Sequence, residues 1–215
     1  MQSSKEWDKY YNENKNNKPF VPESFIARIF LSKRPIKLLD SYNFKDKKIL
    51  DVGCGDGRHI DFCNKLGFSS YGIEVSESKV NELRRKFPCN EFKIGISGNI
   101  GYDSNFFDYL MAVNSIYYLD ENDTLEKNIH ECSRVLQDGG VFIASFVGQN
   151  HFVFQDDSLN LHQCDSNIKM HKTSSKDEIR TVCTKANLSV QFIGEIHDEI
   201  ESYDRHLYYV VAKKL

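Results

Sequence analysis

The sequence predicts an α/β fold: a doubly wound, seven-stranded, mostly parallel sheet with an antiparallel last strand and helices on both faces. From residue 47 onward, short apolar runs typical of strands alternate with amphipathic segments typical of helices. Such alternation implies parallel strands joined by right-handed crossovers. The last two apolar runs have no helix between them, only a polar stretch at 197–205. The final strand is therefore expected to run antiparallel to the others.

The first 45 residues differ in character from the rest. They contain an aromatic cluster near the N-terminus, an Asn/Lys-rich stretch and then "KPFVPESFIARIFLSKR". Pro22 stands where a helix can begin. Proline has no backbone N–H, but in the first turn of a helix that group has no hydrogen-bond partner within the helix, so nothing is lost. The residues that follow place Phe25, Ile26 and Ile29 on one helical face. We expect a helical extension over 1–45 and a main domain over 46–215.

In the first half of the main domain, three strands alternate with two helices before a fourth strand. Gly67 suits the left-handed position after a helix, and Pro88 ends the next helix. The expected strands are 47–53, 69–75, 91–97 and 107–115, and the expected helices are 58–67 and 76–88.

In the second half, capping patterns mark two helices. Asp123 and Glu126 are spaced as a capping box for a helix that Gly139 and Gly140 end, and Ser175 and Glu178 repeat the pattern. The expected helices are 122–140 and 174–188, and the expected strands are 141–147, 189–196 and 206–215. The segment 149–172 shows no clear period. A long irregular insertion in a domain of this size is more often functional than accidental, so we expect it on the substrate side.

Composition excludes several classes of protein. Lys and Arg number 28 against 31 Asp and Glu, and no basic stripe is visible, which disfavours a nucleic-acid partner. No apolar run reaches the ~18–20 residues that span a bilayer, and the N-terminus lacks a secretory signal. Six scattered cysteines show neither a C-x-x-C pair nor zinc spacing, so no metal is expected. We therefore expect a cytoplasmic protein without a membrane partner.

The strongest motif is the glycine loop in "ILDVGCGDGRH", which follows the first strand. Ligands of an open parallel sheet bind beyond the carboxyl ends of its strands, where this loop lies. A P-loop would need Lys-Ser/Thr after the last glycine, and Arg58-His59 stands there instead. A dinucleotide loop would need a glycine at position 58, although an acid for the ribose is present in Glu74, 23 residues past Asp51. A nucleoside without phosphates fits best, because acids at the loop tolerate a nearby cationic group.

Taken together, these motifs resemble the class I S-adenosylmethionine-dependent methyltransferases of the small-molecule type. "ILDVGCGDGRH" and "GIEVS" resemble the first two motifs of that family, and "FDYLMAVNSIYYL" and "LQDGGVFIASF" resemble those of its fourth and fifth strands. The resemblance extends over residues 47 to about 148, and over 173–215 in outline. It implies S-adenosyl-L-methionine as cofactor and a small molecule as substrate.

The resemblance also implies roles for residues at the loop and at the second strand. Gly53, Gly55 and Gly57 would wrap the methionine part of the cofactor, and Asp51 would organise the loop. Glu74 would accept hydrogen bonds from both ribose hydroxyls, and Val75 would pack on the adenine.

The third strand departs from the family pattern, since many members carry an acid after it for the adenine amino group. Here Ser97, Gly98 or Asn99 would have to supply that contact. Asn114, after the fourth strand, would face the methionine end. Tyr11 belongs to a "W-D-x-x-Y" element (7–11) that would fold over the cofactor, although simple aromatic packing explains it equally well.

The chemistry asks little of the protein, because the sulfonium is already activated and positioning dominates. His151 is the candidate general base, since the loop after the fifth strand borders the substrate pocket. Tyr117 and Tyr118 are expected on the substrate side or in the core.

The sequence thus predicts methyl transfer to an oxygen, or secondarily a nitrogen, of a small molecule such as a metabolite or sugar. No N-P-P-Y motif follows the fourth strand, which disfavours amide and adenine acceptors. Two alternatives stay open: a methyltransferase-like protein that binds the cofactor or a partner without catalysis, and an NAD-dependent oxidoreductase, which Arg58 disfavours.

Overall fold

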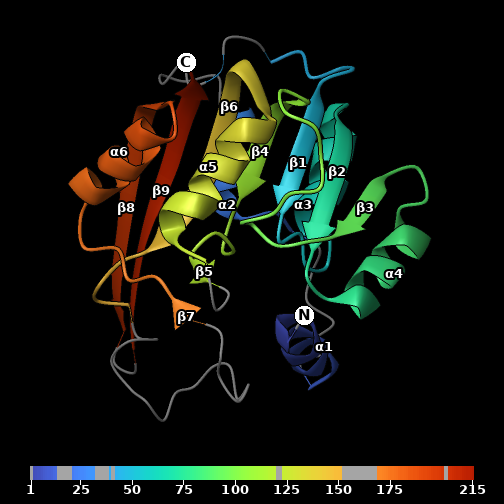
Figure 1. Cartoon of the computed structure of the whole chain (residues 1–215), viewed down its shortest axis with the longest axis horizontal. Helices are drawn as coiled ribbons and strands as arrows, with labels where there is room; N and C mark the ends of the chain where they lie inside the picture. Colours follow the sequence, from blue (N-terminus) through green and yellow to red (C-terminus); the bar gives the residue numbers. More distant parts are fainter. Residues whose placement is uncertain are drawn as a thin grey trace.

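A seven-stranded sheet in the order β3-β2-β1-β4-β6-β9-β8 forms the centre of the computed structural model, which describes residues 2–13, 21–31, 39, 42–119, 123–151, 169–200 and 203–215 (Figure 1). Its strands are β1 (Lys48–Val52), β2 (Ser69–Glu74), β3 (Glu91–Ile94), β4 (Phe107–Ala112), β6 (Leu136–Val147), β8 (Leu188–Ile200) and β9 (Tyr203–Lys214). Strands β3, β2, β1, β4 and β6 pair in parallel, and β9 is antiparallel to both of its neighbours. The predicted fold class, including the antiparallel last strand, is confirmed.

Helices cover both faces of this sheet (Figure 1). They are α1 (Gln2–Glu13), α2 (Ser24–Leu31), α3 (Arg58–Leu66), α4 (Glu77–Lys86), α5 (Leu125–Val135) and α6 (Lys176–Lys185). Helices α5 and α6 pack on one face, whereas α2 and α3 pack on the other. A second, two-stranded sheet joins β5 (Tyr118–Leu119) to β7 (Lys169–Met170), and no pattern in the sequence indicated it.

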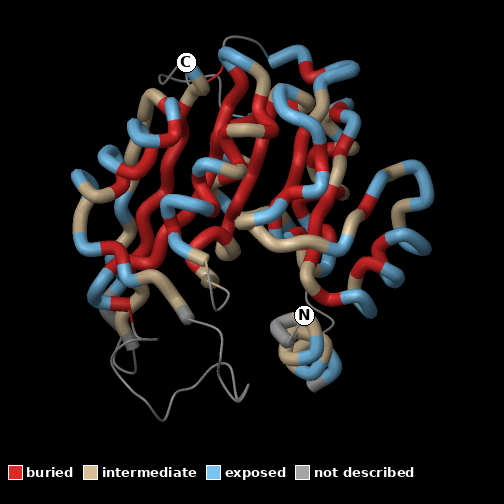
Figure 2. The backbone as a smooth tube through the Cα atoms, in the orientation of Figure 1, coloured by how far each residue is buried: buried red, intermediate tan, exposed pale blue. Residues whose placement is uncertain are grey.

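The core is two apolar layers, one on each face, because successive strand residues point to opposite sides. In β4, Leu110 lies in the layer under α5 and α6, while Met111 lies in the layer under α2 and α3. Strand β6 repeats this alternation with Phe142 and Ile143. Figure 2 shows the buried residues running along these central strands. This double burial explains why the strands read as continuous apolar runs.

Three expected boundaries were wrong. Thr124, not Asp123, caps α5: its side chain accepts a hydrogen bond from the Lys127 backbone N–H at 3.1 Å. That helix ends at Val135, before the two glycines, which lie inside β6. The polar stretch 197–205 is mostly strand, since β8 and β9 pair as far as Ile200 and Tyr203. Hairpin pairing satisfies the backbone there, so polar side chains do not interrupt the strands.

The other cap and the N-terminal region follow the expectation more closely. Ser175 caps α6 by accepting from the Glu178 backbone N–H at 3.2 Å. Helix α2 was expected, whereas α1 was not. Most of the expected insertion 149–172 lies outside the described residues, which stop at 151 and resume at 169. Among the described helices, none is both long and apolar enough to cross a membrane.

Candidate functional site

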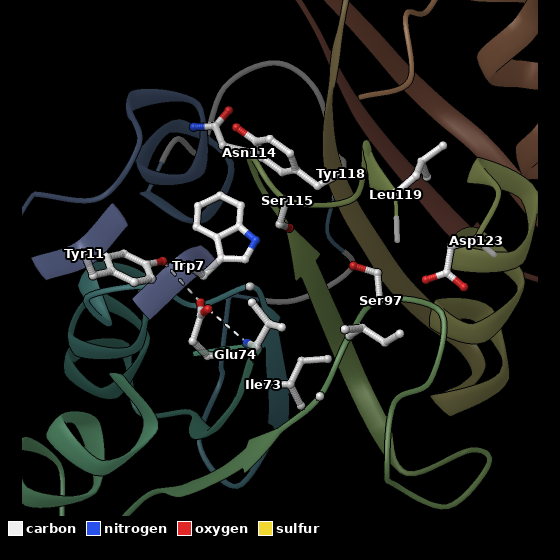
Figure 3. A pocket seen from close by; sticks show the side chains of 14 residues that line it. Trp7, Tyr11, Ile73, Glu74, Ser97, Asn114, Ser115, Tyr118, Leu119 and Asp123 are labelled. Atoms are coloured by element: carbon white, nitrogen blue, oxygen red, sulfur yellow. Dashed lines mark hydrogen bonds between the residues drawn. The ribbon is translucent and has the colours of Figure 1, made fainter. Parts of the chain in front are cut away.

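A pocket opens at the carboxyl ends of β1, β2 and β4, and the rings of Trp7 and Tyr11 from α1 form part of its wall (Figure 3). The cavity measures about 130 Å³. It is lined by Trp7, Tyr11, Gly53, Ile73, Glu74, Val75, Gly95, Ile96, Ser97, Asn114, Ser115, Tyr118, Leu119 and Asp123. The lining combines apolar side walls with a few polar groups, as small-molecule sites usually do.

The glycine loop after β1 is left-handed at Gly53, Gly55 and Gly57, with φ of 71°, 52° and 78°. Side chains rarely adopt such angles, so glycine is required for conformation alone. Space adds to this requirement. A Cβ on Gly53 would lie 2.5 Å from the Cβ of Ser115, and one on Gly57 would lie 2.7 Å from Leu83 on α4. Of the three glycines only Gly53 lines the pocket, and Gly57 instead brings the loop against α4.

Glu74, the last residue of β2, presents a buried carboxylate to the pocket. Its Oε1 accepts backbone N–H bonds from Val75 at 2.9 Å and Ser76 at 3.2 Å. Its Oε2 accepts from the Gly55 N–H at 2.9 Å and the Tyr11 hydroxyl at 3.4 Å. Burial raises the pKa of Glu74 above its ordinary value, although the three backbone N–H groups act in the opposite direction. The glycine loop and the strand end thus hold one carboxylate in a fixed position.

Asp51 lies behind the loop, buried and outside the pocket lining. Its Oδ2 makes no hydrogen bond among the described residues, and the His59 Nδ1 lies 3.5 Å away, close enough for a charge contact but poorly aligned for a hydrogen bond. The His59 Nε2 accepts the Glu23 backbone N–H at 3.3 Å, which puts the proton of a neutral ring on Nδ1, facing Asp51. Asp51 therefore connects the loop to the start of α2 rather than to a ligand.

Helix α1 is attached beside the pocket through Asp8. The Asp8 carboxylate accepts hydrogen bonds from the hydroxyls of Ser76, at 2.5 Å, and Ser78, at 2.6 Å, at the start of α4. This attachment places Trp7 edge-on to Tyr118, with ring centroids 5.2 Å apart. It also brings the Tyr11 hydroxyl to Glu74. The "W-D-x-x-Y" element therefore lies against the pocket, and the Asp between its aromatic residues holds it there.

The loop after β3 contributes Ser97 to the pocket lining, whereas Gly98 and Asn99 lie outside it. Asn99 is exposed and pairs with Ile96 in an isolated bridge. Gly98 faces α5, because a Cβ there would lie 2.8 Å from the Asp123 Oδ1 and 2.9 Å from the Asn128 Oδ1. The carboxylate that faces Gly98 is therefore on another segment of the chain, just before α5.

After β4 the chain turns sharply at Asn114, whose φ is 56°. The Asn114 N–H donates to the Ser145 hydroxyl at 2.8 Å, and that hydroxyl donates back to the Asn114 Oδ1 at 3.2 Å. Of the two expected tyrosines, Tyr118 lines the pocket, whereas Tyr117 is buried in an apolar cluster with Val147. Burial raises the pKa of Tyr117 well above its ordinary value, so its hydroxyl keeps its proton at neutral pH.

His151 follows β6 and is buried outside the pocket lining. Burial, with the nearby charges of Arg205 and His206, lowers the pKa of His151 to about 4. Its ring is therefore neutral at pH 7 and weakly basic, which limits it as a general base.

Sequence reasoning missed several lining residues. Ile96 and Leu119 are apolar, and no pattern distinguishes a pocket wall from the core. Ser115 could have been found as the neighbour of Asn114. Asp123 was interpreted as a helix cap. Only the folded structure shows that its side chain is 5% exposed and lines the pocket.

Comparison with known proteins agrees with this geometry. A family model described as a methyltransferase domain matches residues 50–144. A ubiquinone/menaquinone biosynthesis C-methyltransferase of Campylobacter jejuni is 29% identical over 128 residues, which cover 56% of this chain and 53% of the relative. A ubiquinone biosynthesis O-methyltransferase of Coxiella burnetii is 24% identical, covering 49% and 46%. The chain thus spans about half the length of the curated relatives it matches. A solved S-adenosylmethionine-dependent methyltransferase of Methanosarcina mazei shares the fold, with a TM-score of 0.64 and 18% identity over 91% of this chain and 99% of that one.

Proposed function

We propose that the chain is a class I S-adenosylmethionine-dependent methyltransferase that transfers a methyl group to a small-molecule acceptor, because a methyltransferase-domain model matches residues 50–144 and a solved enzyme of that kind shares the fold. The observation that carries this proposal is the carboxylate of Glu74, fixed by three backbone N–H groups at the wall of a pocket beside a left-handed glycine loop.

The residues present fit this cofactor. Gly53 lines the pocket without a side chain, and any side chain there would collide with Ser115. A ligand can therefore approach the backbone closely at this position. We assign Glu74 to the ribose hydroxyls, because a carboxylate can accept from two donors. We assign Val75 to the base and Gly53 with Asn114 to the methionine end.

When bound, S-adenosylmethionine supplies a methyl group on a positively charged sulfur that is ready for transfer. What remains for the chain is to position an acceptor in line with that methyl group and to keep water out. The aromatic rings of Trp7, Tyr11 and Tyr118 serve the second task by closing one side of the pocket. In this proposal, α1 forms a lid on the substrate side, and most of the insertion 149–172 that was expected to join it lies outside the described residues.

The acceptor atom we propose is an oxygen, with nitrogen as the second choice. By their names, relatives act at carbon, at oxygen and at nitrogen. A weakly basic His151 and a protonated Tyr117 are poorly suited to strong base catalysis. We therefore propose that positioning supplies most of the rate, that Tyr117 supports the pocket wall behind Tyr118, and that His151, which is buried outside the lining, does not touch the acceptor.

Titration calorimetry with S-adenosylmethionine, S-adenosylhomocysteine and NAD tests the proposal. We expect micromolar binding of both sulfur ligands and none of NAD. A panel of hydroxyl and amine metabolites, read out by the formation of S-adenosylhomocysteine, then tests turnover. Binding of NAD alone would refute the proposal, and binding without turnover of any acceptor would favour a cofactor-binding protein.

A further inference from the structure

The pocket contains a second carboxylate, Asp123, which the assignments above do not use. Figure 3 shows it across the pocket from Glu74, with Ser97 between them. The Asp123 side chain is 5% exposed and belongs to the segment that leads into α5. Its Oδ1 accepts from the Lys127 Nζ at 2.5 Å. A buried carboxylate is costly unless its oxygens find donors, and Lys127 contacts only one of them.

A second acceptor lies beside it. Asn128 is fully buried, and its amide nitrogen donates to the backbone carbonyls of Ile116 at 3.1 Å and Tyr118 at 3.5 Å. These two bonds fix the orientation of the amide, so its oxygen points the other way. That Oδ1 has no hydrogen-bond partner within the described part of the chain.

Gly98 lets these two oxygens approach the loop after β3. A Cβ on Gly98 would lie 2.8 Å from the Asp123 Oδ1 and 2.9 Å from the Asn128 Oδ1, so any side chain there would push both away. Asp123 lines the pocket together with Ser97, and the buried Asn128 Oδ1 lies behind them, so the acceptors form one wall at this end of the pocket. Such a wall attracts an N–H donor and repels a carbonyl oxygen.

We propose that Asp123, supported by Asn128, selects the base of the bound nucleoside by accepting a hydrogen bond from an exocyclic amino group. This inference rests on the proposed function, since it takes the ligand to be a nucleoside whose ribose lies at Glu74. A 6-aminopurine presents the required donor. A 6-oxopurine presents a carbonyl to the same wall and is rejected.

Calorimetry with S-adenosylhomocysteine and its 6-oxo counterpart, S-inosylhomocysteine, tests the assignment on the full chain. We expect the wild type to prefer the amino form by at least about 100-fold, as sites built around one hydrogen bond do. Asp123→Asn should lose at least about 10-fold in affinity for the amino form and bring the preference below about 10-fold, because an amide can also donate to a carbonyl. Glu126→Gln, a similar charge change on the exposed face of α5, is the matched control and should keep the wild-type preference.

The outcomes separate the two proposals. A wild type that binds neither ligand overturns the proposed function and this assignment with it. A wild type that binds both equally, or an Asp123→Asn variant that keeps the full preference, overturns the assignment to Asp123 and leaves the methyltransferase proposal standing. Should Asp123→Asn fail to fold, as judged by circular dichroism, the wild-type preference and the Asn128→Leu variant decide instead. We expect Asn128→Leu to reduce the preference, and an unchanged preference would overturn the role of Asn128.

Discussion

Replacing Glu74 with glutamine tests the centre of the proposed site. The glutamine side chain has the same shape, but it is neutral and one of its two oxygens becomes an NH2 group. That group would face either the Gly55 N–H or the N–H groups of Val75 and Ser76, which are donors themselves. The variant therefore loses both the charge and half of the acceptors that face the ribose.

The expected effect follows from two hydrogen bonds to a charged group, each about 1.5 kcal/mol or more. Glutamine removes one of these bonds and weakens the other by losing the charge, which comes to about 2 kcal/mol, or about 30-fold in the dissociation constant of S-adenosylhomocysteine. Calorimetry at pH 7.5 measures it, and Glu77→Gln, an exposed residue three positions away, is the control for charge. A Glu74→Gln dissociation constant within threefold of the wild type would refute the ribose assignment.

The pH dependence of binding gives an independent check. In the proposed complex the ionised carboxylate accepts both ribose hydroxyls, so affinity should be present above the pKa of Glu74 and be lost as the pH falls through it. Because burial raises this pKa above 4.5, the loss should begin at a higher pH than an ordinary glutamate would give. Glu74→Gln should lack this acid limb, and its persistence in the variant would show that another group causes it.

Three further changes test other parts of the structure. Gly53→Ala should lower the free energy of urea unfolding by more than Gly139→Ala, which has the same left-handed strain of about 1–2 kcal/mol but no atom within 4 Å of its new Cβ; equal losses would show that the contact with Ser115 is unimportant. Asp8→Ala should release α1 from α4 and speed tryptic cleavage at Lys9, and an unchanged cleavage rate would mean that other contacts hold the helix. The His151 ring should titrate near pH 4 by NMR, so the folded state loses stability as the pH falls from 6.5 towards 4, where only the unfolded ring takes up a proton; titration near 6.5 would contradict its burial.

The sequence predicted the fold well because its evidence is local. Apolar runs, the Gly67 stop and the Ser175 cap act within a few residues, and they survive in the structure, whereas the expected stop at Gly139 and Gly140 does not. The α5 cap was misplaced by one residue because Asp123 and Thr124 are both common N-cap residues and only Asp123 has an acid three positions later. In the structure Thr124 accepts the Lys127 backbone N–H, while the Lys127 side chain pairs with Asp123.

The site was harder to predict, because its residues meet only after folding. Glu74 could be expected from its distance to the glycine loop. The contact between Gly98 and the residues before and within α5 joins positions about 25 to 30 apart in the chain, and no spacing rule predicts it. Helix α1 was missed for a similar reason, since most of its residues are polar and its attachment depends on Asp8 meeting Ser76 and Ser78 at the start of α4.

The three glycines of the loop have a consequence for how this chain could change during evolution. Each is required by its own left-handed backbone, and Gly53 and Gly57 are required also by the space that Ser115 and Leu83 occupy. None of these constraints involves a ligand. A descendant that lost the proposed ligand would still be destabilised if it replaced these glycines, so selection for folding alone would preserve the motif. In such a lineage the first substitutions to accompany loss of function would occur at side chains such as Glu74, because no steric clash restricts the residue type there as it does at the glycines.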